Sequence, residues 1–283
     1  MKIAISAEST IDLTQDILKE YDIKTVAFNL QLGENSYLDG EVTTDEIIKF
    51  ANDTGVLPKT GAINEYRFTE HFENLLKEYD AVIHFSLSSE LSMACSNAER
   101  ASKNLKNVYV VDTRSLSTGI ALLAIHAKQL SDKGLSAKEI YDACVARVPY
   151  VQASFELKRL DFLYKGGRCS SLTYFGANLL KIRPQIIVKD GKMISGKKYR
   201  GNFSHVVKNY CQDVLDEFDN PDLSLAFVTY TTAEPEIVNT AKNALLDRGF
   251  KKVLVTRAGG TITSHCGEDC LGILYINDGD KNL

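Results

Sequence analysis

The chain has 283 residues, which is enough for two substantial domains at about 100 to 200 residues each. Its 44% hydrophobic and 25% charged residues are typical of a globular protein and exclude disorder as the main state. The formal net charge of -4 provides no positive field to attract a phosphate backbone, so we expect no nucleic-acid partner.

The first half of the chain alternates short apolar runs with longer segments of helical period. Strands are expected at residues 1–5, 23–27, 81–87 and 108–111. This alternation is typical of helices packed on the faces of a mostly parallel sheet. The apolar run at the amino terminus is too short for a signal peptide or a membrane span, so we expect a cytoplasmic protein without stable membrane insertion.

Three helix starts carry a capping box, in which a hydroxyl caps the helix and an acidic side chain three residues later bonds back. The pairs are Ser9 with Asp12, Thr43 with Glu46, and Ser136 with Glu139. Two consecutive helices are expected over residues 116–133 and 137–147, with Gly134 ending the first. We therefore predict an α/β domain with a mostly parallel sheet over residues 1–152.

After residue 150 the pattern changes. Asp190 and Gly191 stand between two extended runs, which predicts a hairpin and antiparallel pairing that the first half lacks. Strands are also expected at residues 151–155, 223–230, 252–257 and 270–277, with helices at 201–218 and 235–248. We predict a second α/β domain over residues 153–283, with a mixed or antiparallel sheet and a ligand between the two domains.

Common catalytic signatures are missing, since the chain contains no GxGxxG, GxxxxGK[ST], HExxH or GxSxG motif. This disfavours NTPases, dinucleotide enzymes, zincins and common serine hydrolases. His265, Cys266 and Cys270 lie close together in the sequence. Structural zinc needs four ligands and no second pair of the CxxC type is available, so we expect no metal.

Polar residues at the ends of apolar strands are candidate ligand contacts, because open α/β sheets bind ligands there. Residues 85–92 lead from a strand into Ser88, Ser89 and Ser92, whose hydroxyls suit either a carboxylate or ordinary helix capping. Thr60 offers a further hydroxyl in an expected loop.

Gly166 and Gly167 let the backbone approach a ligand or a partner, and the planar donors of Arg168 suit a carboxylate or a phosphate. Arg200 follows the expected hairpin, where a basic patch and a solvated charged face both fit. His265 lies in an expected turn before a strand, and no acidic residue is placed to orient it. From the residues alone, the chain is a two-domain α/β protein that binds a small anionic ligand.

Taken together, these motifs are similar to those of the DegV family, the bacterial fatty-acid-binding proteins that form the lipid-carrying subunit of fatty acid kinase. The resemblance covers nearly the whole chain, from residues 8–13 to residues 264–267. The matching segments between them are residues 37–40, 58–60, 88–92, 111–115, 163–168, 180–184 and 198–201.

The resemblance implies one long-chain fatty acid buried in a tunnel between two α/β domains. It assigns the carboxylate to Thr60, Ser92 and His265, with Arg168 and Arg200 near the mouth. There a separate ATP-binding kinase subunit would convert the carboxylate to an acyl phosphate. The carrier itself needs no cofactor, because ATP binds to the partner.

The loops with Gly61, Gly166 and Gly167 are implied to support this site. The chain departs from the family pattern at residues 7–8, 61–64, 93–94 and 268–269, next to site residues that it retains. Two other functions stay open. Ser92 or Cys266 with His265 as base would give an acyl hydrolase or transferase. A lipid-sensing regulatory protein would use the same pocket.

Overall fold

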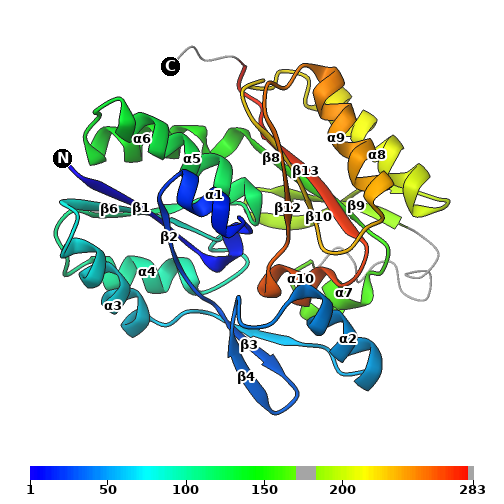
Figure 1. Cartoon of the computed structure of the whole chain (residues 1–283), viewed down its shortest axis with the longest axis horizontal. Helices are drawn as coiled ribbons and strands as arrows, with labels where there is room; N and C mark the ends of the chain where they lie inside the picture. Colours follow the sequence, from blue (N-terminus) through cyan, green and yellow to red (C-terminus); the bar gives the residue numbers. More distant parts are fainter. Residues whose placement is uncertain (170–182, 280–283) are drawn as a thin grey trace.

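The computed structural model describes residues 1–169 and 183–279 (Figure 1). A four-stranded sheet in the first half has the order β2-β1-β6-β7, and all of its strands are parallel. Its strands are β1 (Ile3–Glu8), β2 (Ile23–Val26), β6 (Ala81–Ser86) and β7 (Val108–Asp112). Every residue of the central strands β1 and β6 is buried, as expected where both faces of a parallel sheet are covered. The predicted parallel sheet is confirmed.

Helices cover both faces of this sheet (Figure 1). They are α1 (Gln15–Glu20), α3 (Glu65–Leu76), α4 (Ala94–Ser102), α5 (Thr118–Asp132) and α6 (Ala137–Arg147). Helix α2 (Thr44–Thr54) instead packs on α10 (Gly260–Cys266) of the second half. Helices α3 and α4 pack together on one face, and α5 and α6 pack together on the other. The capping boxes at Thr43 and Ser136 are both formed, with each hydroxyl bonded to the predicted glutamate's backbone amide.

The capping box predicted at Ser9 and Asp12 is wrong. Residues Ser9–Ile11 form a single 3-10 turn, η1, without a side-chain cap. The Ser9 hydroxyl donates instead to Asp39 at 3.0 Å and accepts the Phe28 amide at 3.1 Å. Ser9 and Asp12 both bond to segments far away in the sequence, so neither side chain is free to cap a local helix.

The first half also contains a small antiparallel sheet with the order β4-β3-β5. Its strands are β3 (Asn29–Leu32), β4 (Asn35–Leu38) and β5 (Lys59–Gly61). The expectation that this half lacks antiparallel pairing is therefore wrong. The expected loop around Thr60 is strand β5, in which Thr60 pairs with Leu30. Strands of three or four mostly polar residues carry too little periodicity to be found in the sequence.

The second half forms a six-stranded sheet with the order β10-β9-β8-β13-β11-β12. Its strands are β8 (Val151–Leu157), β9 (Arg183–Lys189), β10 (Lys192–Tyr199), β11 (Ala226–Tyr230), β12 (Val253–Arg257) and β13 (Cys270–Ile276). The β11–β12 pair is parallel and the other pairs are antiparallel, so the predicted mixed sheet is confirmed. The predicted hairpin turns at Asp190 and Gly191, which both have positive φ.

Four helices and one 3-10 turn complete the described part of the second half. They are η2 (Val148–Tyr150), α7 (Asp161–Gly166), α8 (Phe203–Glu217), α9 (Pro235–Arg248) and α10 (Gly260–Cys266). Helices α8 and α9 pack together on the outer face of the sheet, and α7 and α10 contact each other beside the small sheet of the first half (Figure 1).

Helix α5 joins the two halves. It packs on β1 and β6 of the first sheet and also on β8, β11 and β13 of the second. Eleven of its residues are buried, which explains why its sequence is apolar all round instead of amphipathic. One apolar core therefore runs through both large sheets. The division predicted at residue 152 falls in the first residues of β8 and stays a prediction.

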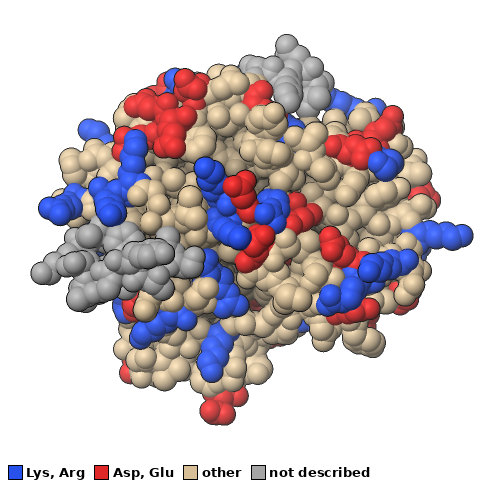
Figure 2. Space-filling view, turned by 180° about the vertical axis from the view of Figure 1, so that it is seen from behind, with Lys and Arg blue, Asp and Glu red and all other residues tan. Residues whose placement is uncertain are grey.

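Acidic and basic side chains are interspersed on the face shown in Figure 2, in keeping with the similar numbers of the two, 37 and 33, in the chain. Among the residues that the structure describes, no helix combines the length and the apolar character that crossing a membrane requires.

Candidate ligand-binding site

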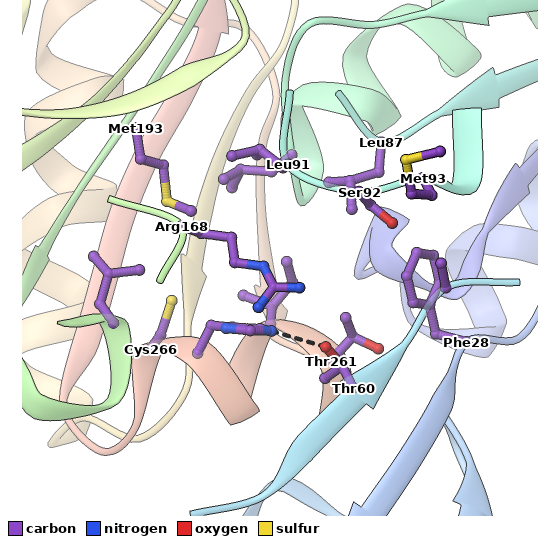
Figure 3. Close-up of a pocket in the computed structure, with 15 residues that line it drawn as sticks. Phe28, Thr60, Leu87, Leu91, Ser92, Met93, Arg168, Met193, Thr261 and Cys266 are labelled. Carbon is purple, nitrogen blue, oxygen red and sulfur yellow. Dashed lines mark hydrogen bonds between the residues drawn. The ribbon is translucent and has the colours of Figure 1, made fainter. Parts of the chain in front are cut away.

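A cavity of about 150 Å³ lies between the two halves of the chain (Figure 3). The residues that line it are Phe28, Thr60, Ala62, Leu87, Leu91, Ser92, Met93, Leu116, Leu163, Arg168, Met193, Thr261, Ile262, His265 and Cys266. Most of them are apolar, and Thr60, Ser92, Arg168 and His265 are four of the predicted site residues. The cavity begins where the segment after β6 leaves the parallel sheet, which is the usual ligand position in such sheets.

A hydrogen bond between Thr60 and His265 connects the two halves across the cavity. The Thr60 Oγ1 and His265 Nε2 atoms are 2.9 Å apart, and Figure 3 shows this bond as a dashed line. His265 lies in the last turn of α10, so its predicted position in a turn is wrong. The α10 sequence begins with Gly260 after the cap residue Gly259 and contains two threonines, so its helix propensity is low.

The His265 imidazole is held in its neutral form. Burial, with a smaller effect of the positive charge of Arg168, lowers its pKa to about 4. Its Nδ1 atom has no hydrogen-bond partner within the described part of the chain. Gly166 covers this atom closely, because a Cβ atom at residue 166 would lie 2.6 Å from Nδ1. Gly166 therefore lets the end of α7 approach the imidazole.

Ser92 lies in the segment between β6 and α4. Its hydroxyl accepts the Ala94 amide at 3.2 Å, and Figure 3 shows it directed into the cavity. Neither Ser88 nor Ser89 caps α4, since this helix begins at Ala94. Ser88 donates to the Gly191 carbonyl at 2.7 Å, and Ser89 donates to Asp112 at 2.6 Å. Among these three serines, only Ser92 lines the cavity.

Arg168 is exposed and reaches into the cavity toward the Thr60–His265 pair (Figure 3). It donates to the Gly166 carbonyl at 2.6 Å. Gly167 ends α7 with a φ of 71°, and Gly61 lines a neighbouring surface depression. Arg200 is exposed after β10 and is not among the lining residues, so its predicted place at the mouth stays a prediction. Residues 170–171 and 180–182 of the predicted motifs lie outside the described residues.

The apolar lining was missed in the sequence. Phe28, Leu116 and Met193 come from three separate segments and follow no motif. A second cavity of about 30 Å³ adjoins the first and shares Leu116, Ile262 and Cys266 with it. It is lined further by residues of β8, β11 and β13, among them Phe155, Thr229 and Leu274. The two cavities together trace an apolar path from the Thr60–His265 pair toward the second sheet.

A metal centre at His265, Cys266 and Cys270 is not supported by the geometry. No group of three metal-ligating side chains occurs in residues 1–169 and 183–279. Burial raises the pKa of the Cys270 thiol well above its ordinary value, which disfavours the thiolate that metals bind. Both cysteines instead line the second cavity.

The fold and the cavity define a class of protein: an α/β protein with a mostly apolar cavity between its halves and polar side chains at one end. Such a cavity suits an amphipathic ligand with a polar head group.

The comparisons with known proteins agree with this class. The family model described as "Uncharacterised protein, DegV family" matches residues 2–278, and the chain belongs to that family. It is 28% identical to a DegV domain-containing protein of Clostridium acetobutylicum, with 97% of this chain and 98% of the relative covered. It is 29% identical to a fatty acid-binding protein of Thermotoga maritima, with 96% of each chain covered.

A solved structure with a similar fold is that of a fatty-acid-binding DegV family protein of Thermus thermophilus. The TM-score is 0.89 at 25% identity, and the alignment covers 98% of this chain and all of the other.

Proposed function

We propose that this chain carries one long-chain fatty acid between two α/β domains, residues 1–152 and 153–283. Its carboxylate would bind Thr60, Ser92 and His265, and its acyl chain would follow the apolar path past Cys266. The observation that carries this proposal is the Thr60–His265 pair at one end of a mostly apolar cavity. The fatty-acid-binding relatives support the same class of ligand.

The energetics favour a carrier. Burying about 14 methylenes at roughly 0.8 kcal/mol each contributes about 11 kcal/mol before the loss of ligand freedom. Hydroxyl and imidazole groups then offset part of the cost of removing the carboxylate from water. Because His265 is neutral, Arg168 supplies the positive charge nearest to the head group among the lining residues. The acyl chain would provide most of the affinity, and the polar end would fix the ligand's direction.

The exposed position of Arg168 supports a second part of the proposal, in which the carboxylate is presented to a separate ATP-dependent kinase. Arg168 lies at the cavity and is also open to solvent. A guanidinium suits both a carboxylate and the added charge of an acyl phosphate. Arg200 would assist from the end of β10. The chain would need no cofactor and would not catalyse phosphoryl transfer alone.

The geometry gives less support to an acyl hydrolase or transferase. His265 Nε2 bonds Thr60, and no acidic group orients Nδ1 among the residues described. An imidazole with a pKa of about 4 is a weak base near pH 7. A regulatory lipid sensor would use the same cavity, and turnover with a kinase separates that function from the carrier.

Native mass spectrometry of the purified full chain tests the ligand, followed by denaturing extraction to identify any small molecule carried from the cells. We expect one fatty acid per chain. An empty protein that still binds nothing after incubation with a panel of fatty acids would contradict the proposal. Release of free acid from an acyl ester, abolished in His265→Ala, would instead support the hydrolase.

Ser92→Ala should weaken fatty-acid binding by about ten-fold or more, because one hydrogen bond to a charged group is lost. Isothermal titration calorimetry with the delipidated chain measures this change. Ser96→Ala is the matched control, since the Ser96 hydroxyl donates to the Met93 carbonyl and does not line the cavity. Equal affinity of the Ser92 variant and the wild type would remove Ser92 from the site.

Arg168→Gln should reduce acyl-phosphate formation with a cognate kinase by at least about ten-fold while changing fatty-acid affinity less, because the guanidinium is exposed beside the head group. Lys165→Gln removes an exposed positive charge from α7 and serves as the control. A coupled assay and calorimetry measure the two properties separately. Equal losses in both would place Arg168 in lipid binding alone.

A further inference from the structure

Two matched motifs, residues 8–13 and residues 37–40, supply no residue to the cavity lining. Each nevertheless places a buried carboxyl group against the helix that carries His265. Asp12 follows η1 and Asp39 follows β4. Both side chains meet the backbone where α10 begins.

Asp39 binds two consecutive amides of the first turn of α10. Its Oδ1 atom accepts from Gly260 at 2.7 Å, and its Oδ2 atom accepts from Thr261 at 3.1 Å. Asp12 accepts from Gly259, the residue before the helix, at 2.8 Å. These amides have no acceptor within a helix. The two carboxyl groups therefore satisfy the start of α10.

The glycine at the start of α10, Gly260, makes this contact possible. A Cβ atom at Gly260 would lie 2.9 Å from Asp39 Oδ1 and 2.5 Å from the Leu30 side chain. Only glycine therefore lets the helix approach Asp39 so closely. Thr44 adds a bond from α2 by donating to the Ala258 carbonyl at 2.7 Å.

Asp39 and Thr60 are held by the same small sheet. Asp39 directly follows β4, and its amide donates to the Phe28 carbonyl at 2.9 Å, while Thr60 lies on β5. The sheet thus contacts α10 at both ends, through Asp39 at the first turn and through Thr60 at His265. A seven-residue helix held at both ends cannot rotate without losing one of these contacts.

We propose that Asp39 is a positioning residue of the head-group site: it holds the first turn of α10 against the β4-β3-β5 sheet and thereby keeps His265 within hydrogen-bond distance of Thr60. The effect on ligand affinity rests on the proposed function. The position of the His265 imidazole in the ligand-free chain does not depend on the proposed function.

The first test uses the delipidated full chain. Asp39→Asn keeps the size of the side chain but turns an NH2 group toward one of the two backbone amides. We expect nuclear magnetic resonance to show a changed His265 Nε2 shift, and the pKa of His265 to rise from about 4 toward its ordinary 6.5 as water reaches the ring. Unchanged His265 signals would overturn the proposal.

Glu46→Gln is the matched control for this measurement. Glu46 also bonds the start of a helix, since its side chain accepts the Thr43 amide at 2.8 Å, but it is exposed and does not line the cavity. Its substitution should leave the His265 signals unchanged, and an equal shift in this variant would contradict the inference. If Asp39→Asn does not fold, Ser9→Ala replaces it, because the Ser9 hydroxyl donates to Asp39 Oδ2 at 3.0 Å and its loss loosens the same carboxylate. A shift in the same direction supports the inference, and no shift overturns it.

The second test is a double-mutant cycle on fatty-acid affinity. Asp39→Asn should weaken binding about ten-fold in the wild-type background and about two-fold or less in the Thr60→Val background, because both changes disrupt the same contact. Additive losses would show that Asp39 acts by another route and would overturn the inference. A wild-type chain that binds no fatty acid would refute the proposed function alone, since the His265 measurement needs no ligand.

Discussion

Two titratable groups, Asp12 beside the start of α10 and His265 near its end, are both neutral near pH 7, because burial shifts their pKa values in opposite directions. Burial raises the pKa of Asp12 to about 8, although bonds from Ser117 and Gly259 act against this shift. Burial lowers the pKa of His265 to about 4. Desolvation disfavours the charged form of each group. Near pH 7 neither group therefore adds a charge beside α10.

The Asp12 carboxyl group predicts a specific dependence of stability on pH. Folded Asp12 keeps its proton up to about pH 8, whereas the unfolded chain releases it near the ordinary pKa of 3.8. The unfolded state binds fewer protons in this window, so the free energy of unfolding should fall as the pH rises from about 4 to 8 and then level off. Asp12→Asn should reduce this slope, to which Glu156 also contributes because burial raises its pKa well above the ordinary value. Urea unfolding at several pH values measures the reduction.

His265 gives a slope of the opposite sign, because its folded pKa lies below its ordinary 6.5 and stability rises with pH between about 4 and 6.5. Measurements between pH 6.5 and 8 therefore separate the Asp12 effect from that of His265. Asp16→Asn, a change at an exposed carboxylate of α1, is the control and should keep the wild-type slope. The same slope in Asp12→Asn would show that Asp12 is not the group responsible.

At the scale of single residues, the sequence predicted the polar end of the cavity and missed its apolar walls. The resemblance to the DegV family assigned Thr60, Ser92 and His265, whereas the residues alone left the serines open between ligand binding and helix capping. Met193 and Leu116 resemble any other core residue, and only the approach of distant segments places them at the cavity. For the same reason Ser9 and Asp12 were misread as a local cap, since their partners lie far along the chain.

At the scale of elements, the β9–β10 hairpin closes one side of the cavity. Its turn docks on the segment that carries Ser92: the Ser88 hydroxyl donates to the Gly191 carbonyl at 2.7 Å, and Arg114 donates to the Asp190 carbonyl. Met193, two residues after the turn, lines the cavity. The hairpin and the Ser92 segment therefore support each other.

Gly191→Ala should weaken this contact. Gly191 has a φ of 80°, and a Cβ atom there would lie 2.5 Å from the Ser88 hydroxyl oxygen. We expect a loss of about 1–3 kcal/mol in the free energy of unfolding and faster dissociation of the fatty acid, measured by urea unfolding and by transfer to a fluorescent acceptor protein.

Gly134→Ala is the matched control for the hairpin, because Gly134 has a φ of 87° with no atom within 4 Å of the added Cβ. It should show a backbone cost without a change in ligand dissociation. Equal dissociation rates for Gly191→Ala and the wild type would mean that the hairpin does not control release of the ligand.

The elements differed in how far the sequence predicted them. Buried strands such as β6 and long helices such as α5 carry a strong apolar signal, and both were predicted. Strands β3 to β5 are short and partly polar. Helix α10 has glycine both at its cap, Gly259, and at its first position, Gly260. The latter elements depend on tertiary contacts, such as those of Asp39 with Gly260 and Thr261, which local propensity does not record.

At the scale of the whole molecule, a buried ionic cluster ties α6 to the second sheet. Arg147 donates to Asp278 at 2.7 and 2.9 Å and to Asp222 at 2.8 Å. Asp278 follows β13 and Asp222 precedes β11. The cluster lies away from the cavity lining and joins the same two halves that α5 joins.

Arg147→Ala should lower the free energy of unfolding by about 3–5 kcal/mol, because it leaves buried carboxylates without their cation. Urea unfolding measures this loss. Arg100→Ala breaks the exposed pair of Arg100 with Glu65 and should cost at most about 1 kcal/mol. Losses of similar size in the two variants would show that the cluster does not hold the halves together.

The position of β13 has a consequence for how the protein is made. This strand lies in the middle of the second sheet, between β8 and β11, although it is the last strand in chain order. The parallel sheet of the first half has all its strands once residue 112 has left the ribosome, whereas the second sheet stays divided until residue 276 emerges. We therefore expect the nascent chain to expose unpaired edges of β8 and β11 late in translation, when chaperones would protect them.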